Sequence, residues 1–143
     1  MKWDARFMEL AKHVAGWSKD PSSTVGAVVV RPDRTICSVG FNGLPRGVKD
    51  RPERLLDRDQ KLRYMVHAEA NAILSAREPL NNYSLYVWPF HPCCHCAAAI
   101  IQSGIKEVHC PDTTVTRWSE SFDTAKVMFT EARITLTLHT NDA

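Results

Sequence analysis

The sequence of 143 residues has only 6 glycines, no long apolar run and no excess of charge of one sign. With 44% hydrophobic and 24% charged residues, it lies outside the collagen-like, low-complexity and disordered classes. The 18 Lys and Arg residues against 16 Asp and Glu leave a formal charge of +2, well short of the basic excess of proteins that bind long nucleic acid. The apolar stretches are too short to span a bilayer. We therefore expect neither a nucleic-acid nor a membrane partner.

Disulfide bonds are also not expected. The five cysteines are an odd number, and three of them fall within four positions: Cys37, Cys93, Cys94, Cys96 and Cys110. This distribution favours a reducing compartment or a metal site over a disulfide framework. No apolar signal segment follows Met1. We expect a soluble, cytoplasmic protein with a single domain over residues 1–143, long enough to bury a full core.

The hydrophobic periodicity predicts a β-hairpin followed by alternating helices and strands. Helices are expected at residues 3–17, 68–76, 97–103 and 119–132, and strands at 25–30, 35–41, 84–87, 107–110 and 134–138. Residues 42–62 show no lasting period and are expected to form a long loop of the kind used for binding. This order predicts an α/β fold in which one sheet carries helices on both faces.

Two fragments carry most of the chemical information. They are His67-Ala68-Glu69 and Pro92-Cys93-Cys94-His95-Cys96, each at a predicted strand-to-helix junction. A catalytic zinc site needs three protein ligands and one open position, and His67, Cys93 and Cys96 supply an imidazole and two thiolates. Glu69 is close enough to reach water on such an ion and to act as the catalytic proton carrier. Together the two fragments match the H-x-E and P-C-x-x-C signature of zinc deaminases.

Plainer interpretations exist for the second fragment. A C-x-x-C pair alone is also typical of a redox dithiol or of half a structural zinc site. A structural site would take a fourth ligand, for which Cys94 and His95 are the nearest candidates. A helix that starts at this point would turn both of them away from the face shared by Cys93 and Cys96.

The chain resembles the deoxycytidylate (dCMP) deaminases of the cytidine deaminase-like superfamily. The resemblance covers about residues 18–134 and rests on S-K-D-P-S at 18–22, G-F-N-G at 40–43, H-A-E-A-N-A-I at 67–73 and P-C-x-x-C at 92–96. It implies a three-layer α/β/α sandwich around a mixed five-stranded sheet. It also implies zinc-dependent conversion of dCMP to dUMP and ammonia for dTMP synthesis, in which Glu69 protonates the cytosine ring nitrogen and then helps the amine to leave.

The same resemblance implies contacts with the nucleotide from Asn42, Ala68 and Lys19. The basic residues of the predicted loop are further candidates for binding the 5′-phosphate: Arg46, Lys49, Arg51, Arg54 and Arg58. Two plainer alternatives stay open here. Asn42-Gly43 is also a typical tight-turn dipeptide with positive φ, and a basic residue in a loop is most often simply solvated.

Many members of the family are hexamers that dCTP activates and dTTP inhibits, often with Mg²⁺ on the triphosphate. The resemblance implies effector contacts at Gly40, Asn42 and Gly43. Phe41 stands in this turn where tyrosine is more usual, so one hydroxyl for hydrogen bonding is lost.

Other functions remain possible from the sequence. One group comprises deaminases of a 5-substituted dCMP, of free cytidine or of a nucleic-acid base. A different class is a non-catalytic, zinc-stabilised protein that binds nucleotides. Glu69 discriminates between these classes, because a structural zinc site has no need of a carboxylate beside the metal.

Overall fold

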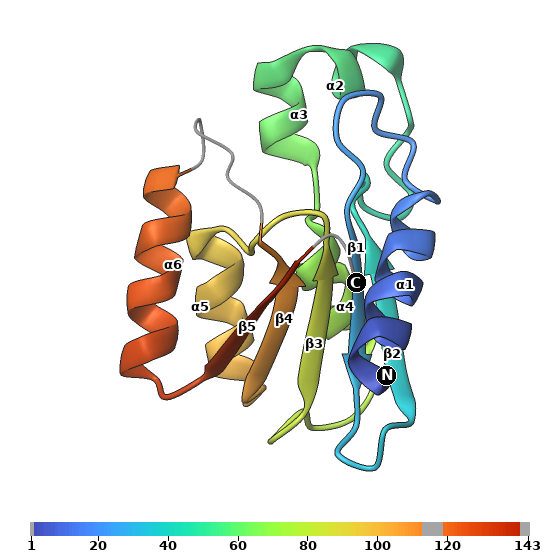
Figure 1. Cartoon of the computed structure of the whole chain (residues 1–143). Helices are drawn as coiled ribbons and strands as arrows, with labels where there is room; N and C mark the ends of the chain where they lie inside the picture. Colours follow the sequence, from blue (N-terminus) through green and yellow to red (C-terminus); the bar gives the residue numbers. More distant parts are fainter. Residues whose placement is uncertain (1, 113–118, 141–143) are drawn as a thin grey trace.

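The structure, a computed structural model, describes residues 2–112 and 119–140. Its centre is a mixed five-stranded sheet in the order β2-β1-β3-β4-β5 (Figure 1). The antiparallel part contains β1 (Gly26–Val30), β2 (Ile36–Phe41) and β3 (Ser84–Trp88), with β1 between the other two. The strands β4 (Glu107–Pro111) and β5 (Thr135–His139) extend the sheet in parallel from β3. The predicted hairpin and the mixed sheet are both confirmed.

Helices cover both faces of the sheet and form the predicted three layers. The helix α1 (Trp3–Ala15) packs on one face, and α4 (Ala68–Ser75), α5 (Cys94–Ser103) and α6 (Ser119–Glu131) lie on the other (Figure 1). Gly104, with φ of 93°, ends α5 in the left-handed conformation expected of a C-terminal glycine. Within the described ranges, no helix combines the length and apolar character needed to cross a membrane.

The central strand β1 is buried along its whole length because its side chains serve both layers. Val28 and Val30 pack with Phe7 of α1, whereas Ala27 and Val29 join the larger cluster on the face of α4 and α5. Alternate residues of a strand point to opposite faces, so a run that is apolar throughout is required here.

Two glycines allow the helices to approach the hairpin closely. A Cβ on Gly26 would lie 2.1 Å from the carbonyl oxygen of Ala11 in α1, and one on Gly40 would lie 2.3 Å from the backbone nitrogen of Ala72 in α4. Neither position has room for a side chain. The hairpin is thereby held between α1 and α4, and the H-A-E fragment forms the N-cap and the first two residues of α4.

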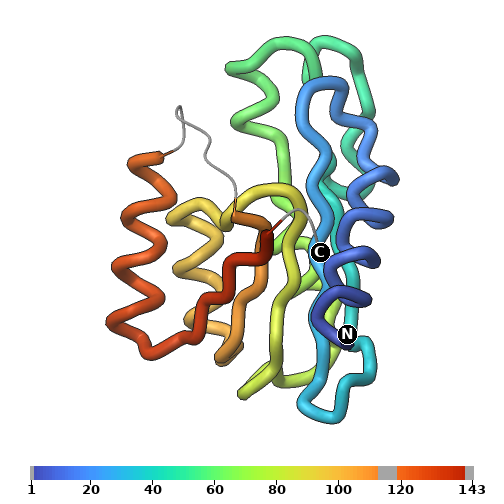
Figure 2. Tube along the Cα trace, in the orientation of Figure 1, coloured from blue at the N-terminus to red at the C-terminus, as the bar shows by residue number. Residues whose placement is uncertain are grey.

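The prediction of a single loop over residues 42–62 is wrong. This region contains α2 (Pro52–Leu56) and α3 (Arg58–Tyr64), which extend beyond the end of the strands (Figure 2). Neither helix contains a fully buried residue, so the apolar periodicity that reveals a core helix is missing. The local signals are Pro52 at the start of α2 and the Asp57 carboxylate, which accepts a hydrogen bond from the backbone N–H of Asp59.

Candidate active site

Two helix N-termini meet at the centre of the site. His67 is the N-cap residue of α4, and Cys93 is the N-cap residue of α5, which follows the carboxyl end of β3. The Cys93 sulfur accepts a hydrogen bond from the backbone N–H of Cys96 at 3.5 Å. This contact starts α5 earlier than periodicity alone predicts. It also places the positive end of a helix beside the sulfur atoms, which favours thiolate.

The structure brings His67, Cys93 and Cys96 into one cluster. The Nδ1 atom of His67 lies 3.6 Å from Sγ of Cys93 and 3.3 Å from Sγ of Cys96. Zinc bonds of about 2.3 Å to sulfur and about 2.0–2.1 Å to nitrogen, at tetrahedral angles, separate the two atom types by about 3.5 Å. The cluster therefore fits zinc. Among the described residues, Cys94 and His95 are not part of it.

The charges of the cluster also suit a cation. A hydrogen bond with Cys96 holds the pKa of the Cys93 thiol well below its usual range; partial burial opposes this effect, and the hydrogen bond with His67 reinforces it. The hydrogen bond between Cys93 and His67 also raises the pKa of the His67 imidazole. Cys93 is thus the first of the two thiols to lose its proton, and a thiolate is the form of cysteine that binds metal.

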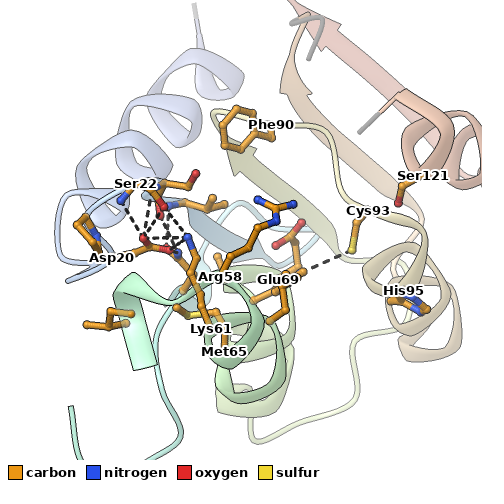
Figure 3. Close-up of a pocket in the computed structure, with 18 of the residues that line it drawn as sticks. Asp20, Ser22, Arg58, Lys61, Met65, Glu69, Phe90, Cys93, His95 and Ser121 are labelled. Atoms are coloured by element: carbon orange, nitrogen blue, oxygen red, sulfur yellow. Dashed lines mark hydrogen bonds and ion pairs between the residues drawn. The ribbon is translucent and has the colours of Figure 1, made fainter. Parts of the chain in front are cut away.

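Glu69 lies in the first turn of α4 and has only 5% of its surface exposed. Burial raises the pKa of its carboxyl group to about 7. A carboxyl group with such a pKa both accepts and releases protons near neutral pH. Figure 3 shows Glu69 and Cys93 on the same side of one pocket. Glu69 thus has the position and the chemistry of a general acid and base.

The pocket that contains Glu69 and the cluster is a cavity of about 690 Å³. This size falls in the usual range for sites of small ligands and cofactors. Apolar side chains supply much of the wall: Leu55, Leu56, Leu62, Met65, Phe90 and Phe122. The Arg58 side chain reaches from α3 into the cavity between Lys61 and Glu69 (Figure 3). The pocket therefore has a reactive end and, near it, the cationic group of the exposed residue Arg58.

Asp20 and Lys61 form a second polar group in the wall, which sequence reasoning missed. The Asp20 side chain is 1% exposed, and its carboxylate lies 2.8 Å from the Lys61 ammonium. Burial alone would raise the pKa of Asp20, but hydrogen bonds from Lys61 and Ser22 outweigh it and lower the pKa. One sequence signal could have indicated that Lys61 lies in the wall beside Arg58. The two residues are three apart, and residues three apart on a helix share a face.

Asn42 lies in the pocket wall, buried, with its side-chain amide bonded to the protein on both sides. Its Oδ1 accepts from the backbone N–H of Val25 at 2.8 Å, and its Nδ2 donates to the Ser23 carbonyl at 2.8 Å and to Asp20 at 3.3 Å. Gly43 is not the left-handed turn considered above. Instead it pairs with Val66, directly before His67, in an antiparallel bridge.

The other residues singled out in the sequence have varied surroundings. Ala68 is fully buried in the pocket wall. Lys19 lies outside the cavity, 74% exposed, and pairs with Asp50 at 2.8 Å. Of the five basic residues of the predicted loop, Arg58 is the one that lines the cavity. Gly40 is buried against α4, so its position is explained by packing.

Comparison with known proteins agrees with this geometry. Residues 1–111 match the family described as "Cytidine and deoxycytidylate deaminase zinc-binding region". An uncharacterized deaminase in the luxG 3′ region of Aliivibrio fischeri is 45% identical over 139 residues, which are 95% of this chain and 92% of that protein. The chain belongs to the cytidine and deoxycytidylate deaminase family. This family member is a zinc-dependent deaminase.

Two further proteins similar to this deaminase have more specific names. A probable deoxycytidylate deaminase of Caenorhabditis elegans is 40% identical over 138 residues, with 94% of this chain and 68% of that protein covered. The crystal structure of dCMP deaminase from the cyanophage S-TIM5, in complex with dCMP and dUMP, superposes with a TM-score of 0.75 at 22% identity. That match covers 97% of this chain and 99% of the phage chain and confirms the fold.

Proposed function

We propose that this deaminase hydrolyses dCMP to dUMP and ammonia. The observation that carries the proposal is a single cavity lined by His67 and Cys93 of the metal-binding cluster, by buried Glu69 and by the cationic side chain of Arg58. Deamination needs the metal-binding cluster and the carboxyl group of Glu69. A nucleoside monophosphate also needs a cation to bind its phosphate, which a free nucleoside lacks. The names of the relatives support the same substrate.

The residues of the chain divide the chemistry between them. Zinc, when held by His67, Cys93 and Cys96, supplies a Lewis acid that makes water nucleophilic at neutral pH. Glu69 accepts a proton from the attacking water and delivers it to N3 of the cytosine ring. It then passes the second proton of the water to the amino group, which leaves as ammonia. The water oxygen remains on the ring as the carbonyl of dUMP.

Arg58 is our candidate for the 5′-phosphate. Its side chain lines the cavity, and among the described residues no ion pair with an acid holds its guanidinium. Lys61 lines the same wall, but its ammonium is already paired with buried Asp20. A guanidinium makes bidentate bonds to phosphate oxygens, so Arg58 is the better suited of the two cations.

Asn42 and Ala68 complete the proposed nucleotide site. Ala68 packs beside Glu69 and gives the wall close contact with the base, since it has no side chain beyond Cβ. Asn42 directly follows β2, and the three hydrogen bonds of its side chain link the end of this strand to the 20–25 loop. We propose that it positions the wall against which the sugar lies.

We further propose, from the family resemblance, a homohexamer that supplies dUMP for dTMP synthesis and responds to dCTP and dTTP, with Mg²⁺ on the triphosphate. The connection of the effector turn to the site supports a regulatory role. Gly43 exchanges two backbone hydrogen bonds with Val66, of 3.1 and 2.8 Å, and Val66 precedes the ligand His67. A displacement of this turn would therefore reach the first metal ligand.

The test is ammonia release by the zinc-loaded protein from dCMP, 5-methyl-dCMP, cytidine and single-stranded DNA, each with and without dCTP or dTTP. We expect kcat/KM for dCMP to exceed that for cytidine by at least about 10-fold, because a charge-assisted bond to phosphate is worth about 1.5–3 kcal/mol. Equal values for the two substrates would reassign the protein to nucleosides. Release from none of them, with zinc bound, would support a non-catalytic nucleotide-binding protein.

A further inference from the structure

A second group of metal-ligating side chains lies on the other face of the sheet, where α1 packs. Asp4 of α1, His109 of β4 and His139 of β5 each offer one ligand atom, and these three atoms all lie within 4.8 Å of one another. We propose that these residues form a second site for a divalent transition-metal ion, separate from the active site. The proposal does not depend on the proposed deamination of dCMP.

His109 is held in a fixed orientation. Its ring is 3% exposed and stacks on Tyr86 of β3, with centroids 4.3 Å apart and an angle of 11° between the rings. Its Nε2 atom faces the Glu107 carboxylate at 3.4 Å, and its Nδ1 atom faces Nε2 of His139 at 2.9 Å. In protein metal sites, a histidine commonly binds the ion through one ring nitrogen and donates the N–H of the other to a carboxylate. His109 has this arrangement, with Nε2 toward Glu107 and Nδ1 toward His139.

This arrangement defines the protons of the metal-free pair. With the proton of His109 on Nε2 toward Glu107, its Nδ1 is an acceptor, and His139 donates its Nε2–H to it. Metal binding displaces that shared proton: His139 moves it to its own Nδ1 and stays neutral, so the two facing lone pairs are free to bind the ion. Two imidazole nitrogens on a tetrahedral zinc ion lie about 3.4 Å apart. The pair therefore opens by about 0.5 Å, which the half-buried His139 near the end of β5 can accommodate.

Asp4 supplies the negative charge. The Tyr86 hydroxyl donates to Oδ1 of Asp4 at 2.6 Å and holds the carboxylate, one oxygen of which lies within 4.8 Å of the ligand atoms of both histidines. Two imidazoles and one carboxylate are a ligand set that zinc and neighbouring first-row metals accept, whereas magnesium and calcium prefer oxygen alone. A metal in this position would join the first turn of α1 to β4 and β5, three elements distant in sequence.

The experiment measures zinc bound per chain, at a buffered free zinc concentration, for the full chain and three variants. We expect about two zinc ions in the parent and about one in both Asp4→Asn and His139→Gln. The asparagine keeps a carbonyl oxygen for the Tyr86 hydroxyl, so this variant tests charge and not packing. His13→Gln is the matched control, an exposed histidine on the same helix, and should retain both ions.

Cobalt(II) separates the two sites by a second measurement. The cysteine cluster gives sulfur-to-cobalt charge-transfer absorption, and the proposed site gives only the weaker ligand-field bands of nitrogen and oxygen ligation. In Asp4→Asn we expect the sulfur absorption and the deamination rate to stay at the parent level while one cobalt is lost. The proposal is overturned if the parent binds one zinc that Cys96→Ser removes, with no change in Asp4→Asn or His139→Gln.

Discussion

The Sγ atom of Cys96 lies 3.3 Å from Nδ1 of His67, although 29 residues separate them in the sequence. The intervening chain leaves α4, crosses the sheet as β3 and returns into α5, so that the N-termini of both helices meet at the same end of the sheet. Ligands bind at this edge in many α/β folds because loops and helix N-termini converge there. The fold thus assembles the metal-binding cluster from two fragments that are individually ambiguous.

The first prediction concerns Cys96. Replacement by serine removes a thiolate and leaves His67 and Cys93, too few ligands for a stable tetrahedral site. We expect the zinc affinity of this site to fall by at least about 100-fold, with loss of deamination. Competition with a chromophoric chelator measures the affinity. Cys94→Ser is the matched control, since Cys94 is adjacent in sequence but outside the cluster, and should bind zinc as the parent does.

The second prediction concerns Glu69. Glu69→Gln keeps the size of the buried side chain but removes its ability to carry a proton, so kcat for dCMP should fall at least about 100-fold. Zinc content and thermal stability should remain near those of the parent. Glu53→Gln changes the equivalent first-turn position of α2, away from the cavity, and should be fully active. Parent-like turnover by Glu69→Gln would show that another group transfers the proton.

The sequence identified the parts of the molecule whose residues repeat with a clear period or form a rare motif. The five strands and four sheet-packing helices follow from buried periodic residues, and the H-A-E and P-C-x-x-C fragments specify the cluster. By contrast, α2 and α3 bury no residue completely, so their hydrophobic pattern is that of a charged loop, and only the local signals at Pro52 and Asp57 indicate where they begin. The contact of Asp20 with Lys61 was also hidden, because it depends on how α3 folds back over the 20–25 loop.

Third, Arg58 should determine the preference for a phosphorylated substrate. Arg58→Ala removes the guanidinium, and we expect kcat/KM for dCMP to fall by about 10- to 100-fold, as for loss of a charge-assisted hydrogen bond. The value for cytidine should not change, because that substrate has no phosphate. Arg54→Ala is a matched control: Arg54 stacks 4.6 Å from the centre of the Tyr64 ring and does not line the cavity. An equal loss for both substrates would indicate a structural role for Arg58.

Fourth, the ion pair of Asp20 with Lys61 should make stability depend on acid pH. The pKa of Asp20 is lower in the folded protein than its usual value of 3.8, so its contribution is fully present above about pH 4. That contribution is lost as the pH falls from there toward the lowered folded pKa, where the carboxylate becomes protonated. Lys61→Met removes the main partner that lowers the pKa, so the folded pKa moves back toward or above 3.8 and this acid-dependent part of the stability should shrink.

Urea unfolding at closely spaced values between pH 3 and 6 tests the fourth prediction. At neutral pH we expect Lys61→Met to lose about 1–3 kcal/mol, because it leaves a buried carboxylate without its cation. Lys106→Met, an exposed position in the turn before β4, should follow the parent curve. If the two variants gave the same acid profile, the pairing with Asp20 would not govern stability.

Fifth, a residue outside the site should limit stability. Arg133 follows α6 with φ of 61°, in the left-handed region that favours glycine. The surrounding hydrogen bonds fix it there: Ile134 N–H donates to the Phe129 carbonyl at 2.9 Å, and Arg133 N–H donates to the Thr130 carbonyl at 3.1 Å. These two bonds form a Schellman motif, the common helix end in which glycine occupies the position of Arg133.

Arg133→Gly should therefore stabilise the protein. Relief of the left-handed strain gains about 1–2 kcal/mol, and the greater freedom of glycine in the unfolded chain removes part of that gain. We expect a net increase of about 0.5–1 kcal/mol, seen as a rise in Tm of roughly 2–4 °C. Arg133→Ala is the decisive control, since it removes the same side chain but keeps Cβ. If alanine stabilised as much as glycine, the gain would come from loss of the arginine and not from its backbone conformation.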